Sequence, residues 1–420
     1  MSHHDVLIVG GGLAGLACAL ELQTHGVESL ILEAGDGVGG RVRTDEFEGF
    51  LLDRGFQVLL EAYPECQRLL DYEALDLKPF YPGASIWTGE AFTRFADPYR
   101  RPGDVMATLA SPIGSVSDKL RVTRLRSEVR KDRDPQSLLA GPDVTIRDDL
   151  TALGFSPGMI DGFFQPFFGG VLLDPDLSDS SRIFRYIFRM FSEGDISVPA
   201  RGMGEIPRQL AGSLPDDAIR LETRVRGVRS NAVTLEGGEE ISADAVVVAT
   251  EGPEAAKLLH GFPAPASKSV SCLYFQAPEP PLDGPVLVLN GSASGAVNNL
   301  AVMSEVSPEY APRGQHLVAV SCLGLPPDSM AALEKEVRAQ VGEWFGGVVE
   351  EWRFLKSYVI PHAQPRQAPG TLEPAERPVT VEPGLFVCGD HRDTASLQGA
   401  LRSGSRTAQA VLAQGKAGGA

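Results

Sequence analysis

The chain has 420 residues, of which 43% are hydrophobic and 22% charged, and its formal net charge is −17. At about 100–200 residues per domain, this length predicts two or three domains with a sizeable core. The acidic balance argues against a nucleic-acid-binding role, which needs basic surface to neutralise phosphates. It also disfavours global attraction to an anionic membrane, although a local basic patch stays open.

The N-terminus and the cysteines bear on compartment and metal content. Only four residues precede Asp5, which leaves no room for a signal peptide, and no apolar run approaches the roughly 18 residues of a membrane span. The five cysteines are scattered and no CxxC occurs, so neither a zinc site nor a dithiol site is expected. We therefore expect a cytoplasmic protein without a metal.

The first segment predicts a strand, a glycine turn, a helix and a second strand. Val6–Val9 is a short apolar run, which is typical of a buried parallel strand. A GxGxxG cluster follows, and the amphipathic run from Gly15 to His25 predicts a helix that ends before Gly26. The second apolar run, Ser29–Leu32, ends at an acidic residue.

This order of elements is typical of an adenine-dinucleotide site. Gly10 permits the tight turn, Gly12 lets the backbone approach a pyrophosphate, and Gly15 lets helix and strand pack closely. The helix N-terminus offers unpaired N–H groups to phosphates, and Glu33 can accept a hydrogen bond from a ribose hydroxyl. The alternative is a glycine turn that only packs. The candidate residues here are Gly10, Gly12, Leu13, Ala14, Gly15, Glu33 and Ala34.

A second glycine cluster, "GDGVGGRVRT", directly follows this acid. Here the sequence resembles the FAD-dependent superfamily of monoamine oxidases, protoporphyrinogen oxidase and phytoene desaturases. In that superfamily GGR follows the ribose-binding acid, where the loop crosses the pyrophosphate. The resemblance implies FAD rather than NAD, with Gly40 and Arg41 at the phosphates. Arg41 can pair with a phosphate bidentately, and the alternative is a solvated surface arginine.

The resemblance also implies the fold. We expect an α/β protein with an FAD-binding Rossmann-like domain, of the glutathione-reductase type, and an inserted α+β substrate domain. The FAD-binding domain is discontinuous, and the first part of the substrate domain is mostly helical. The expected FAD-binding segments are 1–62, 200–260 and 361–420, and the expected substrate segments are 63–199 and 261–360.

Two later segments look like returns to the nucleotide domain. Between Ala218 and Thr250, the runs Arg220–Val225, Ala232–Leu235 and Ala245–Ala249 predict strands. In resembling proteins the residue that matches Val225 meets the adenine.

The C-terminal return carries a strand, a Gly-Asp pair and a helix. Leu385–Cys388 is a short apolar run, and the later helix has an apolar face that includes Leu401 and Gly404. The segment resembles the superfamily's GD…GA..SG signature, in which the Asp bonds the ribityl or pyrophosphate region and the helix N-terminus faces the flavin. The alternative for this Asp is a plain N-cap. The corresponding candidates are Gly389, Asp390, Gln398, Gly399 and Ala400.

Two further features bear on the flavin. Gly55, Phe56 and Gln57 match the stretch that runs beside the isoalloxazine ring in the superfamily; the alternative for Gly55 is a strand glycine or bulge. Monoamine oxidases anchor their flavin through a cysteine in a downstream loop, whereas Cys388 lies in an apolar strand. We therefore expect FAD to be bound non-covalently.

The middle of the chain is less specific. The polar segment 129–150 predicts a helix end and a solvated loop, or a mobile lid. The aromatic segment 162–191 predicts either domain core or an apolar substrate cavity. Its run "RIFRYIFRMF" could also form a helix at a membrane surface, so the sequence leaves peripheral membrane contact open.

No catalytic side chain stands out. Lys356 is a weak candidate for the lysine that amine oxidases place near the flavin, and the strand "FLKSYVIPHAQP" that contains it resembles one that crosses the flavin face in phytoene desaturases. His362 and His391 could act in acid–base chemistry or could be structural. No metal cluster, Ser–His–Asp order or carboxylate pair is apparent.

These features predict an FAD-dependent oxidoreductase that removes hydride from a C–H bond of a small apolar substrate, as carotenoid and isoprenoid desaturases do. No second GxGxxG appears, so the expected electron acceptor is oxygen or a quinone. The alternatives are an amine or protoporphyrinogen oxidase, a flavin-dependent isomerase, and a non-catalytic binder of the Rab GDP-dissociation-inhibitor type. The oligomeric state is not indicated.

Overall fold

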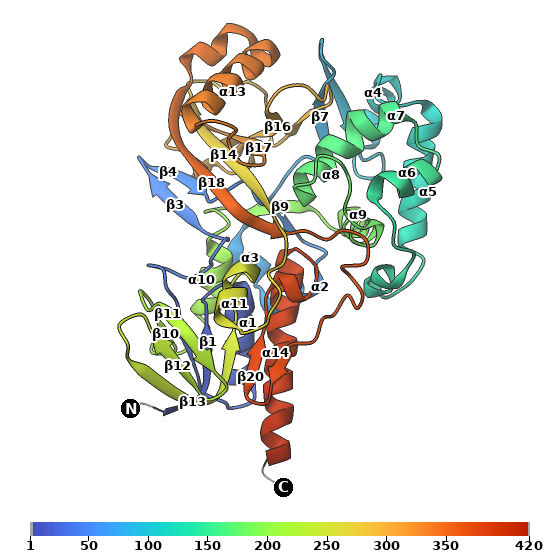
Figure 1. The fold of residues 1–420 in the computed structure, drawn as a ribbon. Coiled ribbons are helices and arrows are strands. Elements are labelled where there is room, and N and C mark those ends of the chain that lie inside the picture. Colours follow the sequence, from blue (N-terminus) through green and yellow to red (C-terminus); the bar gives the residue numbers. More distant parts are fainter. Residues whose placement is uncertain (1–2, 419–420) are drawn as a thin grey trace.

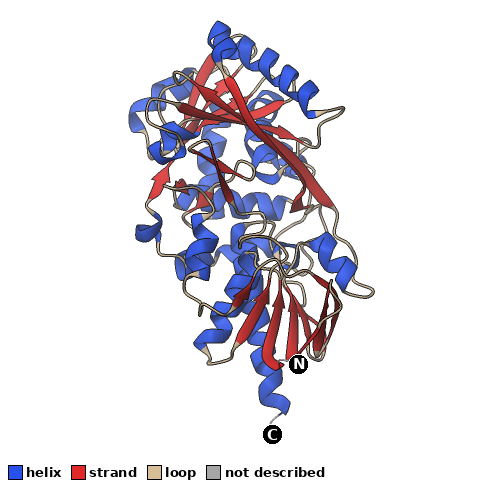
Figure 2. Ribbon diagram, turned by 90° about the vertical axis from the view of Figure 1, so that its left-hand side faces the viewer, coloured by secondary structure: helices blue, strands red, loops and turns tan. Residues whose placement is uncertain are grey.

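The computed structural model describes residues 3–418, which are built on two large sheets at opposite ends of the molecule (Figure 1). The described chain begins in the lower sheet and ends in a helix beside it, and the upper sheet carries a group of helices along one side (Figures 1 and 2). The predicted α/β class is confirmed.

The lower sheet has a parallel centre with an antiparallel flank. β10, β2, β1, β13 and β20 run parallel, while β12 and β11 extend the sheet from β13 as an antiparallel pair and β19 pairs with β20. The sequence "VLIV" is buried because both faces of the centre are covered. The strands are β1 (His3–Val9), β2 (Ser29–Leu32), β10 (Ile219–Arg220), β11 (Val225–Arg229), β12 (Ala232–Leu235), β13 (Glu240–Val248), β19 (Thr380–Glu382) and β20 (Leu385–Val387).

One predicted strand of this sheet is wrong. The run Arg220–Val225 is divided between β10 and β11, which lie at opposite edges of the sheet. The chain leaves β10 and crosses the strand ends, where the Thr223 N–H donates to the Glu33 carbonyl oxygen. The apolar alternation of this run therefore reflects two short edge strands and the crossing between them.

Two helices, α1 (Leu13–Thr24) and α14 (Leu397–Gly418), pack together beside this sheet. Gly404 lies at their contact, and a Cβ atom there would stand 2.2 Å from the Ala14 carbonyl oxygen. Only glycine allows this approach, which brings the start of each helix to the same region above the strands. Two shorter helices also lie close to this sheet: α10 (Glu205–Ala211) contacts α1, and α11 (Gly252–Leu258) contacts β11.

The upper sheet is mixed, in the order β18-β14-β17-β16-β15-β7-β8. Its long strand β18 runs from this sheet down toward the lower one (Figure 1). The helix α13 (Met330–Phe345) packs on the sheet through a separate hydrophobic cluster. A short helix, α12 (Met303–Val306), follows β16. The strands are β7 (Gly83–Trp87), β8 (Phe92–Ala96), β14 (Ser267–Ala277), β15 (Leu287–Asn290), β16 (Val297–Val302), β17 (His316–Leu323) and β18 (Arg353–Pro365).

Smaller elements connect the two ends. A hairpin is formed by β3 (Thr44–Phe47) and β4 (Phe50–Asp53), and a three-stranded sheet by β5 (Leu59–Leu60), β9 (Ile196–Pro199) and β6 (Leu77–Pro79). The helices of this region are α2 (Pro64–Leu69), α3 (Tyr72–Leu75), α4 (Val105–Ala110), α5 (Val116–Val129), α6 (Ile146–Ala152), α7 (Pro157–Met159), α8 (Gln165–Leu172) and α9 (Ser181–Glu193).

The aromatic helix α9 lies in the core, so its reading as a membrane-surface helix is wrong. Phe184 and Tyr186 are at most 1% exposed. Arg185, which lies between them, has acidic partners on neighbouring helices: it pairs with Asp149 at 2.7 Å and with Glu128 at 2.9 Å. The alternation of apolar and basic residues thus serves internal ion pairs. Within the described residues, no helix is both long and apolar enough to span a membrane.

Candidate functional site

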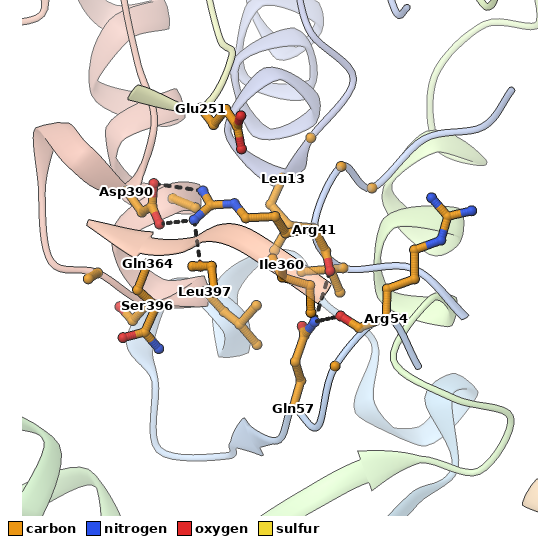
Figure 3. A pocket seen from close by; sticks show the side chains of 18 of the residues that line it. Leu13, Arg41, Arg54, Gln57, Glu251, Ile360, Gln364, Asp390, Ser396 and Leu397 are labelled. Carbon is orange, nitrogen blue, oxygen red and sulfur yellow. Dashed lines mark hydrogen bonds and ion pairs between the residues drawn. The ribbon is translucent and has the colours of Figure 1, made fainter. Parts of the chain in front are cut away.

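A cavity of about 590 Å³ lies between the two sheets, and residues from several distant segments of the chain line it (Figure 3). The starts of α1 and α14, the second glycine cluster, β18 and the aromatic helices all contribute to its wall. Of the residues predicted to bind the cofactor, those in the wall are Gly10, Gly12, Leu13, Ala14, Glu33, Ala34, Gly40, Arg41, Gly55, Phe56, Gln57, Val225, Gly389, Asp390 and Ala400.

The turn between β1 and α1 has the features of an anion cradle. Gly10 has a φ of +111°, which favours glycine, and a Cβ atom at Gly12 would meet nothing within 4 Å. The helix N-terminus at Gly12 has no side-chain cap, and no acidic residue lies in its first turn. The N–H groups at the start of α1 are therefore available to phosphate oxygens.

Gly15 lies behind this turn rather than in the cavity wall. A Cβ atom there would stand 2.1 Å from the Gly10 carbonyl oxygen and 3.3 Å from the Ala249 Cβ. This is the close helix–strand packing expected for the third glycine of the motif.

Glu33 directly follows β2, and its carboxylate is fixed by the two glycine loops. Its Oε2 accepts a hydrogen bond from the Gly11 N–H at 2.7 Å, and its Oε1 accepts one from the Gly35 N–H at 2.7 Å. The Gly39 N–H also donates to the Gly11 carbonyl oxygen at 2.8 Å. The two glycine clusters therefore form one continuous surface on this side of the cavity, with the acid at its edge.

Arg41 and Asp390 join the N-terminal and C-terminal halves of the site. The guanidinium of Arg41 donates to both oxygens of Asp390 at 2.8 Å and to the Ala363 carbonyl oxygen at 2.9 Å (Figure 3). Burial lowers the pKa of Arg41, but the charge and hydrogen bonds of Asp390 outweigh it and leave this pKa above its usual value. Arg41 is thus not a solvated surface arginine, and the two residues assigned to the phosphate and ribityl region lie in contact.

The start of α14 lies at the cavity, although two of its predicted residues do not line it. The wall contains Ser396, Leu397 and Ala400. Gln398 is 2% exposed, and its Oε1 accepts the Glu65 N–H at the start of α2. A Cβ atom at Gly399 would stand 1.9 Å from the Thr394 carbonyl oxygen, so this glycine serves packing.

The strand-end residues Gly55, Phe56 and Gln57 form the wall nearest β18. Gly55 has a φ of +91°, and a Cβ atom there would stand 2.8 Å from the Ile360 Cδ1. The Nε2 of Gln57 donates to the carbonyl oxygens of Arg41, at 2.8 Å, and Arg54, at 3.2 Å. Gln57 therefore fixes the backbone of the arginine that meets Asp390 (Figure 3).

The cavity continues between the upper sheet and the aromatic helices, where its wall is mostly apolar. The aromatic segment 162–191 contributes both to the domain core and to an apolar cavity. Phe184 and Phe168 lie in the core, whereas Phe167 and Phe191 line the cavity. The wall here is formed by Leu60, Tyr63, Pro166, Phe167, Gly170, Val171, Leu173, Ile187, Phe191, Val270, Leu287, Leu289 and Asn299.

The candidates for acid–base chemistry do not line the cavity. The Nζ of Lys356 pairs with Asp45 at 3.2 Å, so the structure does not bring this lysine to the cofactor wall. His362 is exposed on β18. His391 is 2% exposed, packs edge-on against Phe262, and has no hydrogen-bond partner at either ring nitrogen; burial lowers its pKa to about 4.

Cys388 and the other described cysteines are buried free thiols, and burial raises the pKa of Cys388 to about 12. Among the described residues, no group of three or more His, Cys, Asp or Glu side chains could hold a metal ion.

Several lining residues were not predicted from the sequence. Thr250 follows β13 beside the Gly10 turn, and its buried Oγ1 has no hydrogen-bond partner. Its position at the end of a buried parallel strand was the available signal. Asn299, Leu287 and Leu289 lie on strands of the upper sheet, and no local motif marks them.

The residues present fit a bound FAD. The uncapped start of α1, the open space at Gly12 and the unpartnered Thr250 hydroxyl suit a pyrophosphate and its neighbouring ribose. Val225, the Gly55–Gln57 stretch and the start of α14 all contribute to the same cavity wall.

Comparison with known proteins agrees with this fit. Residues 13–412 match the family model of flavin-containing amine oxidoreductases. Protoporphyrinogen oxidase 2 of Arabidopsis thaliana is 27% identical over 177 residues, which are 42% of this chain and 34% of that enzyme. The chain thus spans about a third of that relative's length. Hydroxysqualene dehydroxylase of Rhodopseudomonas palustris is 25% identical over 98% of this chain and 99% of its own.

Among solved structures, cyclohexylamine oxidase from Brevibacterium oxydans has the same fold, with a TM-score of 0.74. The two chains are 16% identical, and the match covers 98% of this chain and 99% of that one.

Proposed function

Because the chain belongs to the family of flavin-containing amine oxidoreductases and is an FAD-dependent oxidoreductase, we propose that it removes hydride from a C–H bond of an apolar, isoprenoid-like substrate. The observation that carries this proposal is the composition of the cavity wall beyond the dinucleotide cradle, which is the part of the wall formed by the Gly10–Gly12 turn, Glu33 and Asp390. That wall consists almost entirely of aliphatic and aromatic side chains from α8, α9, β15 and β14.

The distribution of charge in the cavity argues for a neutral substrate. The carboxylates among the described lining residues are Glu33, Glu251, Glu254 and Asp390. All four follow β2, β13 or β20, on the cradle side of the cavity. A cationic amine buried in the apolar part would therefore lack a counter-charge, which is costly in a dry environment.

One of the arginines that line the cavity is also occupied. Arg54 donates through its Nε and Nη2 to Asp45, at 3.1 and 2.9 Å. It is therefore not free to pair with the carboxylates of a porphyrinogen. The full-length alignment with a relative named hydroxysqualene dehydroxylase also favours a squalene-like carbon skeleton.

FAD, when bound, accepts the hydride and so supplies the redox chemistry. The chain's own residues position the substrate: Phe167, Ile187 and Phe191 form an apolar wall on one side. The start of α14, where the Ser396 hydroxyl accepts the Gly399 N–H at 3.0 Å, lies at the cavity, and the positive end of the helix dipole stabilises negative charge there.

Loss of a proton from the neighbouring carbon then completes a new C=C bond. No carboxylate or imidazole among the described residues of the apolar wall can take this proton, so we assign it to solvent water. The electrons leave the protein to oxygen or a quinone.

The proposal is tested by comparing two ligands of one skeleton, farnesene and farnesylamine, as titrants of the FAD-loaded protein. We expect farnesene to perturb the flavin absorbance and the ammonium form of the amine to bind at least about 10-fold more weakly, because its charge has no partner. Tighter binding of the amine, together with anaerobic bleaching by amines alone, would instead indicate an amine oxidase.

A further inference from the structure

The apolar part of the cavity contains one buried amide, that of Asn299 on β16. Asn299 is 5% exposed and lines the cavity. It lies directly opposite Leu289 of β15 in the antiparallel pair, and Leu287 pairs with Ala301 one step further along the same face. An amide at this position therefore interrupts an otherwise aliphatic surface.

A β-bulge places this side chain. Along β16, Val297 pairs with Cys322 of β17 and Asn299 pairs with the neighbouring Ser321, so Asn298 is an extra residue. Val297 packs in the cluster beneath α13, whereas Asn299 faces the cavity on the other side of the sheet. Without the bulge, residues 297 and 299 would share one face. The bulge therefore directs an amide toward the cavity.

The orientation of the amide follows from its neighbours. The Nδ2 of Asn298 donates to the Pro166 carbonyl oxygen at 3.0 Å and to the Asn299 Oδ1 at 2.9 Å. Because a donor faces Asn299, its own Oδ1 must take that position. No acceptor among the described residues takes its Nδ2, which is left for a ligand in the cavity.

The packing of α8 keeps this arrangement rigid. A Cβ atom at Gly170 would stand 2.7 Å from the Asn298 Nδ2 and 3.2 Å from the Asn299 Oδ1. The helix thus approaches the two amides as closely as glycine permits. A donor held rigidly in an apolar wall discriminates between ligands, since one without an acceptor leaves it unpaired.

We propose that Asn299 determines specificity by donating a hydrogen bond from Nδ2 to an oxygen of the substrate. The substrate class is then an isoprenoid-like molecule with a hydroxyl, ether or carbonyl oxygen, and not a pure hydrocarbon. This inference rests on the proposed function, because it places the substrate in the apolar part of the cavity.

The test uses three ligands of one skeleton, farnesene, farnesol and farnesyl methyl ether, with dissociation constants measured from the flavin difference spectrum of the FAD-loaded protein. We expect the alcohol and the ether to bind about 5- to 10-fold more tightly than farnesene, as one additional hydrogen bond allows. The ether has an acceptor and no O–H donor, so its behaviour isolates the donor role of the Nδ2.

In Asn299→Leu, and in Asn299→Ala if the larger side chain prevents folding, we expect all three ligands to bind with similar constants. The matched control is Asn231→Leu, at an exposed turn between β11 and β12, which should keep the wild-type ratios. The inference is overturned if the alcohol and the ether still bind more tightly than farnesene in both Asn299 variants, or if they do not do so in the wild type. In either case, binding of farnesene itself leaves the proposed function intact. If none of the three ligands binds, the proposed function fails and the inference fails with it.

Discussion

The substitution Gly12→Val separates cofactor binding from folding. Gly12 has a φ of −76° and a ψ of 178°, which valine adopts, and its Cβ would enter open space in the cavity. The folded chain should lose at most about 1 kcal/mol, the cost of a poorer helix N-cap. The added isopropyl group, however, occupies the place where a pyrophosphate approaches the N–H groups of Leu13 and Ala14.

The effect on cofactor affinity follows from those two donors. Hydrogen bonds to a charged group contribute about 1.5–3 kcal/mol each, so losing two weakens FAD binding by about 150- to 25,000-fold. The assay is titration of the stripped protein with FAD, followed by quenching of flavin fluorescence, together with a thermal melt of the same sample without FAD.

Two glycine variants serve as controls. Gly237→Val lies in an exposed turn, where a Cβ atom also meets nothing within 4 Å, and it should bind FAD normally. Gly15→Ala forces a Cβ atom to 2.1 Å from the Gly10 carbonyl oxygen and should destabilise the protein itself. Wild-type FAD affinity in Gly12→Val would refute the placement of the pyrophosphate at the start of α1.

Three further predictions concern residues outside the cavity wall. His391 is buried and neutral, and its pKa of about 4 lies below its unfolded value, so the folded protein loses stability as pH falls. Relative to His391→Phe, the free energy of unfolding of the wild type, measured by urea melts, should fall by about 1.4 kcal/mol from pH 7.5 to pH 5.5. Asp53 has the opposite sign, because burial raises its pKa to about 6 and its charge is unfavourable. Relative to Asp53→Asn, the wild type should lose about 1 kcal/mol as pH rises from 5.5 to 7.5, and no change in this difference would contradict the burial argument. Lys356→Met should leave FAD affinity and the rate of flavin reduction unchanged, since the lysine pairs with Asp45 outside the cavity; a large loss of rate would return it to the reaction.

The cofactor side of the site could be predicted because its requirements are local. A tight turn, a close approach and a helix start each restrict the residue at one position, and Gly10, Gly12 and Glu33 occupy those positions. The strand Ser29–Leu32 was predicted with its observed bounds for the same reason, since a short apolar run between a turn and an acid has few alternatives.

What the sequence could not predict depends on partners far along the chain. Gln398 turns from the cavity to the Glu65 N–H, 333 residues away, and Lys356 turns to Asp45, 311 residues away. Arg185 of α9 suggested a membrane surface because its acidic partners, Glu128 and Asp149, lie on α5 and α6. Asn299 depends on a bulge whose register is set by β17. Side-chain direction at each of these positions is a property of packing, which local patterns do not encode.

The most direct test of the account is one anaerobic turnover of the FAD-loaded protein with isoprenoid alcohols, followed by mass spectrometry of the extracted ligand. The account predicts that the visible flavin absorbance bleaches and that an equal amount of ligand becomes lighter by two hydrogens. Unchanged isoprenoids beside a flavin that only amines bleach would contradict it.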